Sequence, residues 1–379
     1  MIDKVLKDCT GCGACGDKCP VGAISFKYNN EGFAYPEISV DTCTNCNLCE
    51  QACPILSIDA GYNKIKSYAS FSYSKPKESS SGGMFYSFAS AIIEDNGVVY
   101  GAAFNNEMQL SHLRVDRIDD LKKLCGSKYV QSDCSGIYKQ VYQDLKSGIK
   151  VLFSGTPCQV SGLKKYLRKD YEFLYTVDLI CHGVPSPRIF ADWIRYCETL
   201  RNKRVVGFLT RDNREGWDNR FRSTLYFEND KEEYNSMLSN LWNRIFFSEL
   251  ATRQSCSNCK FASLNRRGDI TLGDFWGIDN VCPEMYEKSG VSLIQVNTLK
   301  GQSLFERISY LSKIQESSTT EKEHPNLYHP TQGNPQRKQF MRDYSQHGFA
   351  FVIKRYFGYT RWLDLKIRLN TFLNNIIKK

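Results

Sequence analysis

CTGCGACGDKCP at residues 9–20 and CTNCNLCEQACP at residues 43–54 are two copies of one cysteine pattern. In each copy, three closely spaced cysteines can bind three corners of a cubane [4Fe–4S] cluster, and a fourth, followed by proline, can reach the neighbouring cluster. The pattern therefore predicts two clusters with crossed ligands. The predicted ligands are Cys9, Cys12, Cys15 and Cys53 for cluster one, and Cys43, Cys46, Cys49 and Cys19 for cluster two.

The spacing favours cubanes over the alternative, a pair of zinc knuckles. Zinc sites need four ligands each and typically set their cysteine pairs apart, whereas this spacing is tight and triple. Small residues between the cysteines let backbone N–H groups approach the cluster sulfides; they are Gly11, Gly13, Ala14 and Gly16. We therefore expect residues 1–60 to form a two-cluster module of the bacterial ferredoxin type.

The composition is that of a globular protein from a reducing compartment. The chain has 379 residues, 16 cysteines and a formal net charge of +9. Its first residues carry charges where a secretory signal needs an apolar stretch, so we expect a cytoplasmic protein whose cysteines bind metal. No apolar run is long enough for a membrane span, and no nucleic-acid partner is expected. The positive charge suits docking of an acidic electron carrier, or it is simply a solvated basic surface.

Beyond residue 60, apolar runs of strand length alternate with helical patterns. This alternation favours a mixed sheet with parallel strand pairs. Residues 62–77 and 316–340 are polar and carry no predicted element, and residues 79–83 form a flexible turn before a helix. Strands are predicted at residues 98–104, 109–115, 150–153, 173–180, 205–209, 222–227, 269–275 and 291–297, and helices at 84–93, 118–124, 137–146, 159–168, from 187, at 234–247 and at 301–314.

The predicted domain boundaries follow these changes in pattern. A ferredoxin domain covers residues 1–60, the larger domain has parts at 61–150 and 151–340, and a basic amphipathic helical tail covers 341–379. A helix of this kind can pack on the protein body, or it can contact a membrane surface or a partner. The apolar tail residues at helical spacing are Trp362, Leu365, Leu369, Phe372, Leu373 and Ile376.

Four further cysteines form a second candidate site. Cys158 follows a predicted strand at the start of a helix, where the helix dipole favours a thiolate, and Cys181 ends the next strand. If the two strands are parallel neighbours, both cysteines lie at the sheet edge where such sheets bind ligands. Cys256 and Cys259 add a close pair. Spacing alone leaves open a third [4Fe–4S] cluster, a zinc site, a redox-active Cys256–Cys259 pair and a nucleophilic Cys158.

The remaining cysteines and His182 are expected to be structural. Isolated cysteines are most often buried apolar thiols, and a lone histidine is more often a hydrogen-bonded imidazole than a ligand. The isolated cysteines are Cys125, Cys134, Cys197 and Cys282.

Candidate phosphate-binding residues lie outside the usual nucleotide motifs, because the sequence has neither a Rossmann glycine fingerprint nor a P-loop. One candidate is the run Ser80, Ser81, Gly82 and Gly83 before a helix, and the other is GSKY at residues 126–129, where Lys128 offers a cation and Tyr129 an aromatic ring. Taken alone, serine and glycine runs are more often plain turns.

Five stretches carry a family resemblance: SSGG at residues 80–83, GSKYVQS at 126–132, GTPCQ at 155–159, CHGVPS at 181–186 and GDITLGDFWG at 268–277. Together they resemble the coenzyme F420 hydrogenase/dehydrogenase beta-subunit family over roughly residues 65–340. The resemblance implies a third [4Fe–4S] cluster at Cys158, Cys181, Cys256 and Cys259. It also implies FAD near the Ser-Gly-Gly loop and Lys128, and redox chemistry on a small organic partner.

The predicted fold class is α+β, with a ferredoxin-like module followed by a mixed-sheet α/β flavin-binding domain. The predicted function is an FAD- and [4Fe–4S]-dependent oxidoreductase. It would take electrons from a low-potential carrier, such as ferredoxin or another donor subunit, and pass them through its clusters to FAD and a small organic substrate. The alternative is a non-catalytic subunit that delivers electrons to a partner enzyme. No catalytic residue is predicted, because no paired carboxylate or histidine dyad stands out.

Overall fold

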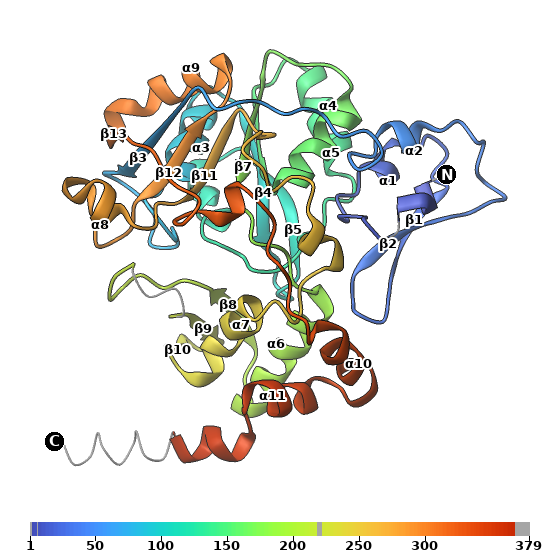
Figure 1. The fold of residues 1–379 in the computed structure, drawn as a ribbon, viewed down its shortest axis with the longest axis vertical. Coiled ribbons are helices and arrows are strands. Elements are labelled where there is room, and N and C mark those ends of the chain that lie inside the picture. Colours follow the sequence, from blue (N-terminus) through green and yellow to red (C-terminus); the bar gives the residue numbers. More distant parts are fainter. Residues whose placement is uncertain (1, 6, 218–221, 368–379) are drawn as a thin grey trace.

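The computed structural model describes residues 2–5, 7–217 and 222–367, and it divides into three parts (Figure 1). A small cysteine-rich module lies beside a large twisted sheet covered by helices, and a lobe of short strands and helices lies at one end of that sheet. No described helix combines the length and the apolar character needed to cross a membrane.

The N-terminal module has little regular structure, as expected for a domain built around metal ligands. Its β1 and β2 form an antiparallel hairpin in which Ile24 pairs with Ile38. Ile2, Val5 and Phe26 pack against the cysteines from one side. The elements of the module are η1 (Ile2–Val5), α1 (Ala14–Lys18), β1 (Ile24–Tyr28), β2 (Ala34–Ile38) and α2 (Leu48–Gln51).

The central sheet has eight strands in the order β13-β3-β12-β11-β7-β6-β4-β5. The four strands β11, β7, β6 and β4 are parallel to one another, and the outer pairings are antiparallel, so the predicted mixed sheet is present. The strands are β3 (Lys66–Ser72), β4 (Val98–Phe104), β5 (Leu110–Val115), β6 (Val151–Gly155), β7 (Leu174–Leu179), β11 (Ile270–Asp274), β12 (Ser292–Val296) and β13 (Ser312–Glu316).

Two layers of helices cover the sheet because its strands bury side chains on both faces. Along β4, Val99 belongs to the core under α3 and α9, whereas Val98 and Tyr100 belong to the core under α4 and α5. Helix α1 of the module contacts α4 and α5, so the module docks on that second layer. The covering helices are α3 (Met84–Glu94), η2 (Ile118–Lys123), α4 (Ile137–Lys146), α5 (Pro157–Leu167), α8 (Ile278–Val281), η4 (Pro283–Met285), α9 (Leu299–Ile308) and η5 (Ser309–Leu311).

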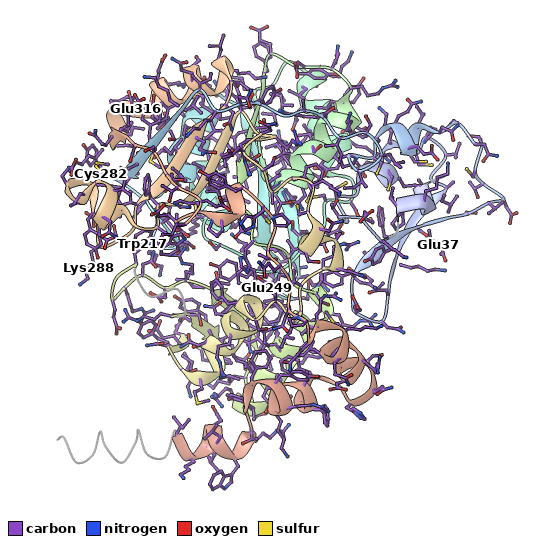
Figure 2. All side chains as sticks on the ribbon, viewed as in Figure 1. Glu37, Trp217, Glu249, Cys282, Lys288 and Glu316 are labelled. Carbon is purple, nitrogen blue, oxygen red and sulfur yellow. The ribbon has the colours of Figure 1, made fainter. Side chains whose placement is uncertain are left out.

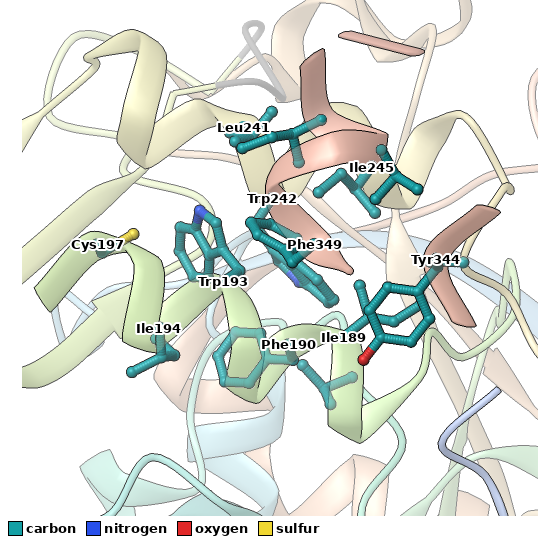
Figure 3. Packing of buried hydrophobic residues seen from close by; sticks show 14 of the residues in the cluster. Ile189, Phe190, Trp193, Ile194, Cys197, Leu241, Trp242, Ile245, Tyr344 and Phe349 are labelled. Atoms are coloured by element: carbon teal, nitrogen blue, oxygen red, sulfur yellow. The ribbon is translucent and has the colours of Figure 1, made fainter. Parts of the chain in front are cut away.

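The smaller lobe differs from the expected continuation of the main sheet. Its strands form a separate three-stranded antiparallel sheet, packed on an aromatic core around Phe190, Trp193 and Trp242 (Figure 3). The lobe comprises α6 (Pro187–Arg201), β8 (Val205–Leu209), β9 (Thr224–Phe227), β10 (Lys231–Tyr234), α7 (Met237–Phe247), η3 (Gln254–Asn258), α10 (Arg337–His347) and α11 (Phe349–Phe357). The turn η6 (Pro325–Leu327) packs instead on the main sheet, where Leu327 joins the core around Phe275.

Several predicted elements were wrong in kind or extent. Residues 118–123 form a 3-10 helix, and the helix expected over 301–314 ends at Ile308, followed by edge strand β13. Strands β3 and β10 were missed, since their serine-rich or charged sequences lack apolar alternation. The tail is helical through α11, and Asp364 pairs with Arg201 of α6. The predicted tail residues Leu369, Phe372, Leu373 and Ile376 lie outside the described residues.

The aromatic core predicts a large stability cost for truncation of Phe190. Its ring is 2% exposed and lies 4.9 Å from that of Trp242 and 5.3 Å from that of Phe104 on β4. Phe190→Ala should cost about 3–5 kcal/mol through lost burial and a cavity. Tyr310→Ala, at a side chain 73% exposed, should cost less than about 0.5 kcal/mol. Anaerobic urea unfolding followed by circular dichroism measures both, and equal midpoints would contradict this packing.

Candidate functional site

Cysteine set one consists of Cys9, Cys12, Cys15 and Cys53, and it lies on the side of the module that faces the larger domain. These four cysteines line one hollow, in which Cys53, from the second copy of the pattern, lies with three cysteines of the first copy. The hollow is lined by Ile2, Val5, Cys9, Thr10, Gly11, Cys12, Gly13, Cys15, Phe26, Pro36, Cys53, Pro54 and Ile55. The apolar side chains exclude water from the sulfurs, and this burial raises the pKa of Cys15.

Cysteine set two lies on the outer side of the same module. Here Cys19, from the first copy, joins the other three cysteines of the second copy, which completes the crossed arrangement. The hollow is lined by Cys19, Val21, Ala23, Ile24, Ile38, Cys43, Thr44, Asn45, Cys46, Asn47 and Cys49. Cys46 is exposed, and a hydrogen bond to the backbone of Leu48 lowers its pKa. Set two is therefore the set nearest to solvent.

Cysteine set three forms at one edge of the large sheet. Strands β6 and β7 are parallel neighbours joined by α5, which places Cys158, in the first turn of α5, near Cys181, which follows β7. Cys256 lies in η3 and Cys259 directly follows it. The backbone N–H of Arg253 donates to the carbonyl of Val184 at 2.9 Å, and this bond holds the Cys256 segment against the residues after Cys181.

The charges of the set-three cysteines affect one another's pKa. Burial raises the pKa of Cys158 to about 11 and that of Cys256 to about 12, and the charge of Cys259 adds to both shifts. Burial also raises the pKa of Cys181 strongly, with contributions from the other three cysteines. Metal binding would therefore have to displace protons from these thiols.

Sets one and three meet where the module docks on α5. Burial raises the pKa of Cys12 to about 12, and the charge of Cys158 adds to the shift. The Thr10 hydroxyl hydrogen-bonds to Cys158. A Cβ atom on Gly162, one turn further along α5, would lie 3.1 Å from Cys12 Sγ, so the lack of a side chain allows this approach.

Two polar anchors fix the module in this position. The carboxylate of Asp17 accepts hydrogen bonds from the backbone N–H groups of Gly136, at 2.7 Å, and of Tyr138, at 3.0 Å, at the start of α4. The Tyr138 hydroxyl in turn donates to the carbonyl of Cys12 at 2.8 Å. Helix α4 therefore contacts the backbone of a set-one cysteine directly.

Over the described part of the chain, no three His, Cys, Asp or Glu side chains are placed to hold a metal ion. The cysteines of sets one and two line hollows.

The predicted phosphate-binding residues lie on two loops that touch. The backbone N–H of Ser127 donates to Ser80 Oγ at 2.7 Å, and Lys128 Nζ donates to the carbonyls of Cys125 and Gly126 at 2.7 and 3.1 Å. Gly83 has a φ of 80° at the start of α3, a left-handed conformation that favours glycine. The structure thus brings the two predicted segments together.

Two other residues of these loops make structural contacts. Ser81 Oγ donates to the carbonyl of Val291 at 2.8 Å. A Cβ atom on Gly82 would lie 2.4 Å from the carbonyl oxygen of Ser70 and 2.7 Å from the nitrogen of Ser292. Packing against the sheet therefore accounts for glycine at position 82. Tyr129 stacks on Phe246 of α7 with a centroid distance of 4.0 Å, so its loop also contacts the smaller lobe.

Sequence reasoning missed Arg211, which follows β8 beside these loops. Its side chain is 1% exposed and pairs with Asp274, yet its Nε and Nη2 have no hydrogen-bond partner among the described residues. Trp217, which is labelled in Figure 2, donates to Asp274 Oδ1 at 3.2 Å and stacks on Trp276 with a centroid distance of 4.7 Å. Asp274 and Trp276 belong to the GDFWG stretch at 273–277, but Arg211 lies in no recognisable motif.

The residues expected to be structural are placed accordingly, with one exception. His182 Nε2 lies 3.1 Å from Glu249 Oε1, and His182 Nδ1 lies 3.3 Å from Asn326 Oδ1; the four isolated cysteines are buried. Cys134, however, also has polar neighbours within its apolar core. Its sulfur lies 3.2 Å from His112 Nδ1 and 3.2 Å from Gln159 Nε2. Burial lowers the pKa of His112 to about 4, so this imidazole is neutral.

The crossed arrangement can be tested by comparing variants in pairs. Because Cys53 lies with Cys9 and Cys19 lies with Cys46, we expect Cys53→Ser to remove the same reduced-state paramagnetic signal as Cys9→Ser. Cys19→Ser should remove the signal that Cys46→Ser removes. The control Cys125→Ser, at a buried cysteine outside the sets, should keep both signals. A Cys53→Ser spectrum that matches Cys46→Ser would contradict the crossing.

Comparisons with known proteins agree with this organisation. Residues 8–55 match the family model described as a 4Fe-4S dicluster domain, and residues 148–322 match the model for the C terminus of the coenzyme F420 hydrogenase/dehydrogenase beta subunit. No curated protein matches the chain. A solved chain from a xenon derivatization of the F420-reducing [NiFe] hydrogenase complex from Methanosarcina barkeri is similar, with 13% identity and a TM-score of 0.45 over 78% of this chain and 92% of that chain.

The two family matches confirm the resemblance that the sequence motifs indicated. The first covers both copies of the cysteine pattern, and the second covers all four cysteines of set three. The chain thus combines a segment that matches a 4Fe–4S dicluster domain with a segment that matches the C-terminal domain of coenzyme F420 hydrogenase/dehydrogenase beta subunits.

Proposed function

We propose that this chain is an iron–sulfur flavoprotein oxidoreductase that relays electrons from a low-potential carrier to FAD and a small organic substrate. Its cysteine sets one, two and three would each hold a [4Fe–4S] cluster, ligated by the twelve predicted cysteines. When bound, the clusters carry single electrons, and FAD connects one-electron to two-electron chemistry.

One observation carries this proposal: sets one and three meet at helix α5, where the Tyr138 hydroxyl contacts the carbonyl of Cys12 at 2.8 Å and that of Gln159, the residue after Cys158, at 3.2 Å. Set one shares its module with set two, so the three sets form a continuous series from the outer side of the module to the edge of the large sheet. If the dicluster module docked elsewhere on the larger domain, sets one and three would not be in contact.

The outer end of the series suits an electron donor. Cys46 of set two is exposed, whereas Cys12 and Cys15 of set one are buried. A protein carrier that docks over set two would therefore approach the cluster that is easiest to reach. We assign this surface to a ferredoxin or another donor subunit.

The inner end of the series offers cations for an anionic cofactor. Lys75 Nζ donates to the carbonyls of Ser81 and Ser289 at 2.7 and 2.8 Å, and Lys128 lies on the adjacent loop. Among the described residues neither lysine forms an ion pair with a carboxylate. Burial lowers the pKa of each to about 8, although the charges of Glu287 on Lys75 and of Glu78 on Lys128 act in the opposite direction. The pyrophosphate of FAD would supply the missing negative charge. The N–H groups of Arg211 that lack a partner among the described residues suit a second anionic group.

Anaerobic purification followed by iron, sulfide and flavin analysis tests the proposal. We expect about twelve irons per chain together with about one FAD. About eight irons without flavin would contradict the enzyme and leave a bare electron-transfer subunit, and bound zinc would contradict the clusters themselves.

A pair of lysine variants locates the flavin. Lys128→Met removes a buried cation beside the Ser80 loop and should weaken FAD binding by about tenfold or more, since charged contacts to phosphate are strong. Lys123→Met is the matched control, because that lysine is exposed and pairs with Asp120 at 2.7 Å. Flavin fluorescence titration measures both affinities. Equal affinity in the two variants would place FAD elsewhere.

A further inference from the structure

Arg253 is a buried cation that has only neutral hydrogen-bond partners. Its side chain is 1% exposed. Nε donates to the carbonyl of Cys9 at 2.7 Å, Nη1 to Gln131 Oε1 at 3.0 Å, and Nη2 to the carbonyl of Ala34 at 3.1 Å. Within residues 2–5, 7–217 and 222–367, no ion pair joins it to a carboxylate.

The guanidinium lies at the junction of cysteine sets one and three. On one side it binds the backbone of Cys9 in set one. On the other, the N–H of Cys256 donates to the Arg253 carbonyl at 3.0 Å. Although burial raises the pKa of Cys158 and Cys256, the positive charge of Arg253 acts in the opposite direction on both. One cation is thus close to both sets.

The surroundings make this charge effective. The guanidinium lies over the rings of Tyr35 at 4.3 Å and Phe33 at 5.3 Å, which keep water away. Charge interactions are stronger in such a region than in water, and an unpaired buried ion is costly. The anions that would balance Arg253 are therefore the sulfurs of the adjoining sets.

A second arginine at the same junction, Arg337, does have a carboxylate partner. Arg337 donates to the carbonyl of Thr252, next to Arg253 in the sequence, and it forms an ion pair with Glu31 of the module at 2.6 Å. Its charge is therefore balanced by a carboxylate, as is usual for an interface arginine. Arg253 differs in this respect, although both side chains connect the module to the larger domain.

We propose that Arg253 is a positioning residue that makes clusters one and three easier to reduce than cluster two. A thiolate-bound cubane is net negative and gains one more negative charge when it accepts an electron, so a nearby buried cation stabilises the reduced form more than the oxidised form. If the clusters are bound, the charge of Arg253 would favour an electron on the side of the module that faces set three over one at set two, without bonds forming or breaking. This inference rests on the proposed function.

Redox titration of the full-length holoprotein, followed by paramagnetic resonance of each cluster, tests the inference. Arg253→Gln removes the charge and should lower the reduction potentials of clusters one and three, while cluster two, on the far side of the module, stays unchanged. Arg253→Lys keeps a charge and should retain most of the original potentials. The control Arg337→Gln should leave all three potentials unchanged, and Arg253→Met provides a second neutral variant if the glutamine variant does not assemble.

The outcomes separate this inference from the proposed function. If the unmodified protein lacks three clusters, the proposed relay fails. If three clusters are present and both neutral variants leave the potentials of clusters one and three unchanged, the role of Arg253 fails while the relay stands. Equal potential shifts in Arg253→Lys and Arg253→Gln would also overturn the inference, because they would show that hydrogen-bond geometry, and not charge, matters.

Discussion

The docking of the Cys12 segment on helix α5, beside Cys158, is the constraint on which the rest of the structure depends. Two segments about 150 residues apart must lie side by side, and the surrounding residues are arranged to allow this. Gly162 leaves room on α5, and Asp17 and Tyr138 tie the module to α4. Without this docking, the dicluster module and the larger domain would be two separate redox units.

The topology of the large sheet supplies the other half of the junction. Parallel neighbours β6 and β7 end at the same edge, so the residues that follow them, Cys158 and Cys181, come together without any unusual local structure. The chain then leaves to build the smaller lobe and returns through Arg253 to Cys256 and Cys259. The third cysteine set therefore combines a sheet edge with a returning loop, and the smaller lobe lies between its two halves in sequence.

Local patterns made much of this predictable. The crossed cysteine sets follow from short spacings, and β4, α4 and β8 have the predicted bounds because their apolar runs are continuous or strictly periodic. Strand β3 was missed because its sequence, KSYASFS, is rich in serine. The serine hydroxyls form hydrogen bonds only in the folded structure, as Ser70 does with the carbonyl of Lys313. Local sequence does not encode such long-range bonds.

In the candidate site, too, some residues were predictable from sequence motifs and others were not. Ser80 and Lys128 were predicted to be neighbours only through a family resemblance, and their loops do meet. Arg253 and Arg211 could not be predicted, since each is defined by what surrounds it in three dimensions. The side chain of Arg253 donates hydrogen bonds to residues more than 100 positions away in the sequence. The sequence therefore could not indicate that, among the described residues, it has no carboxylate partner.

The central claim is that three cubanes lie in one continuous series, with cluster one in the middle. Paramagnetic resonance of the fully reduced, anaerobically prepared protein tests it most directly, because reduced clusters that lie close together broaden and split each other's signals. We expect an interacting spectrum from three clusters, which simplifies to that of one interacting pair when Cys181→Ser removes the third. A non-interacting spectrum, or one that Cys181→Ser leaves unchanged, would contradict it.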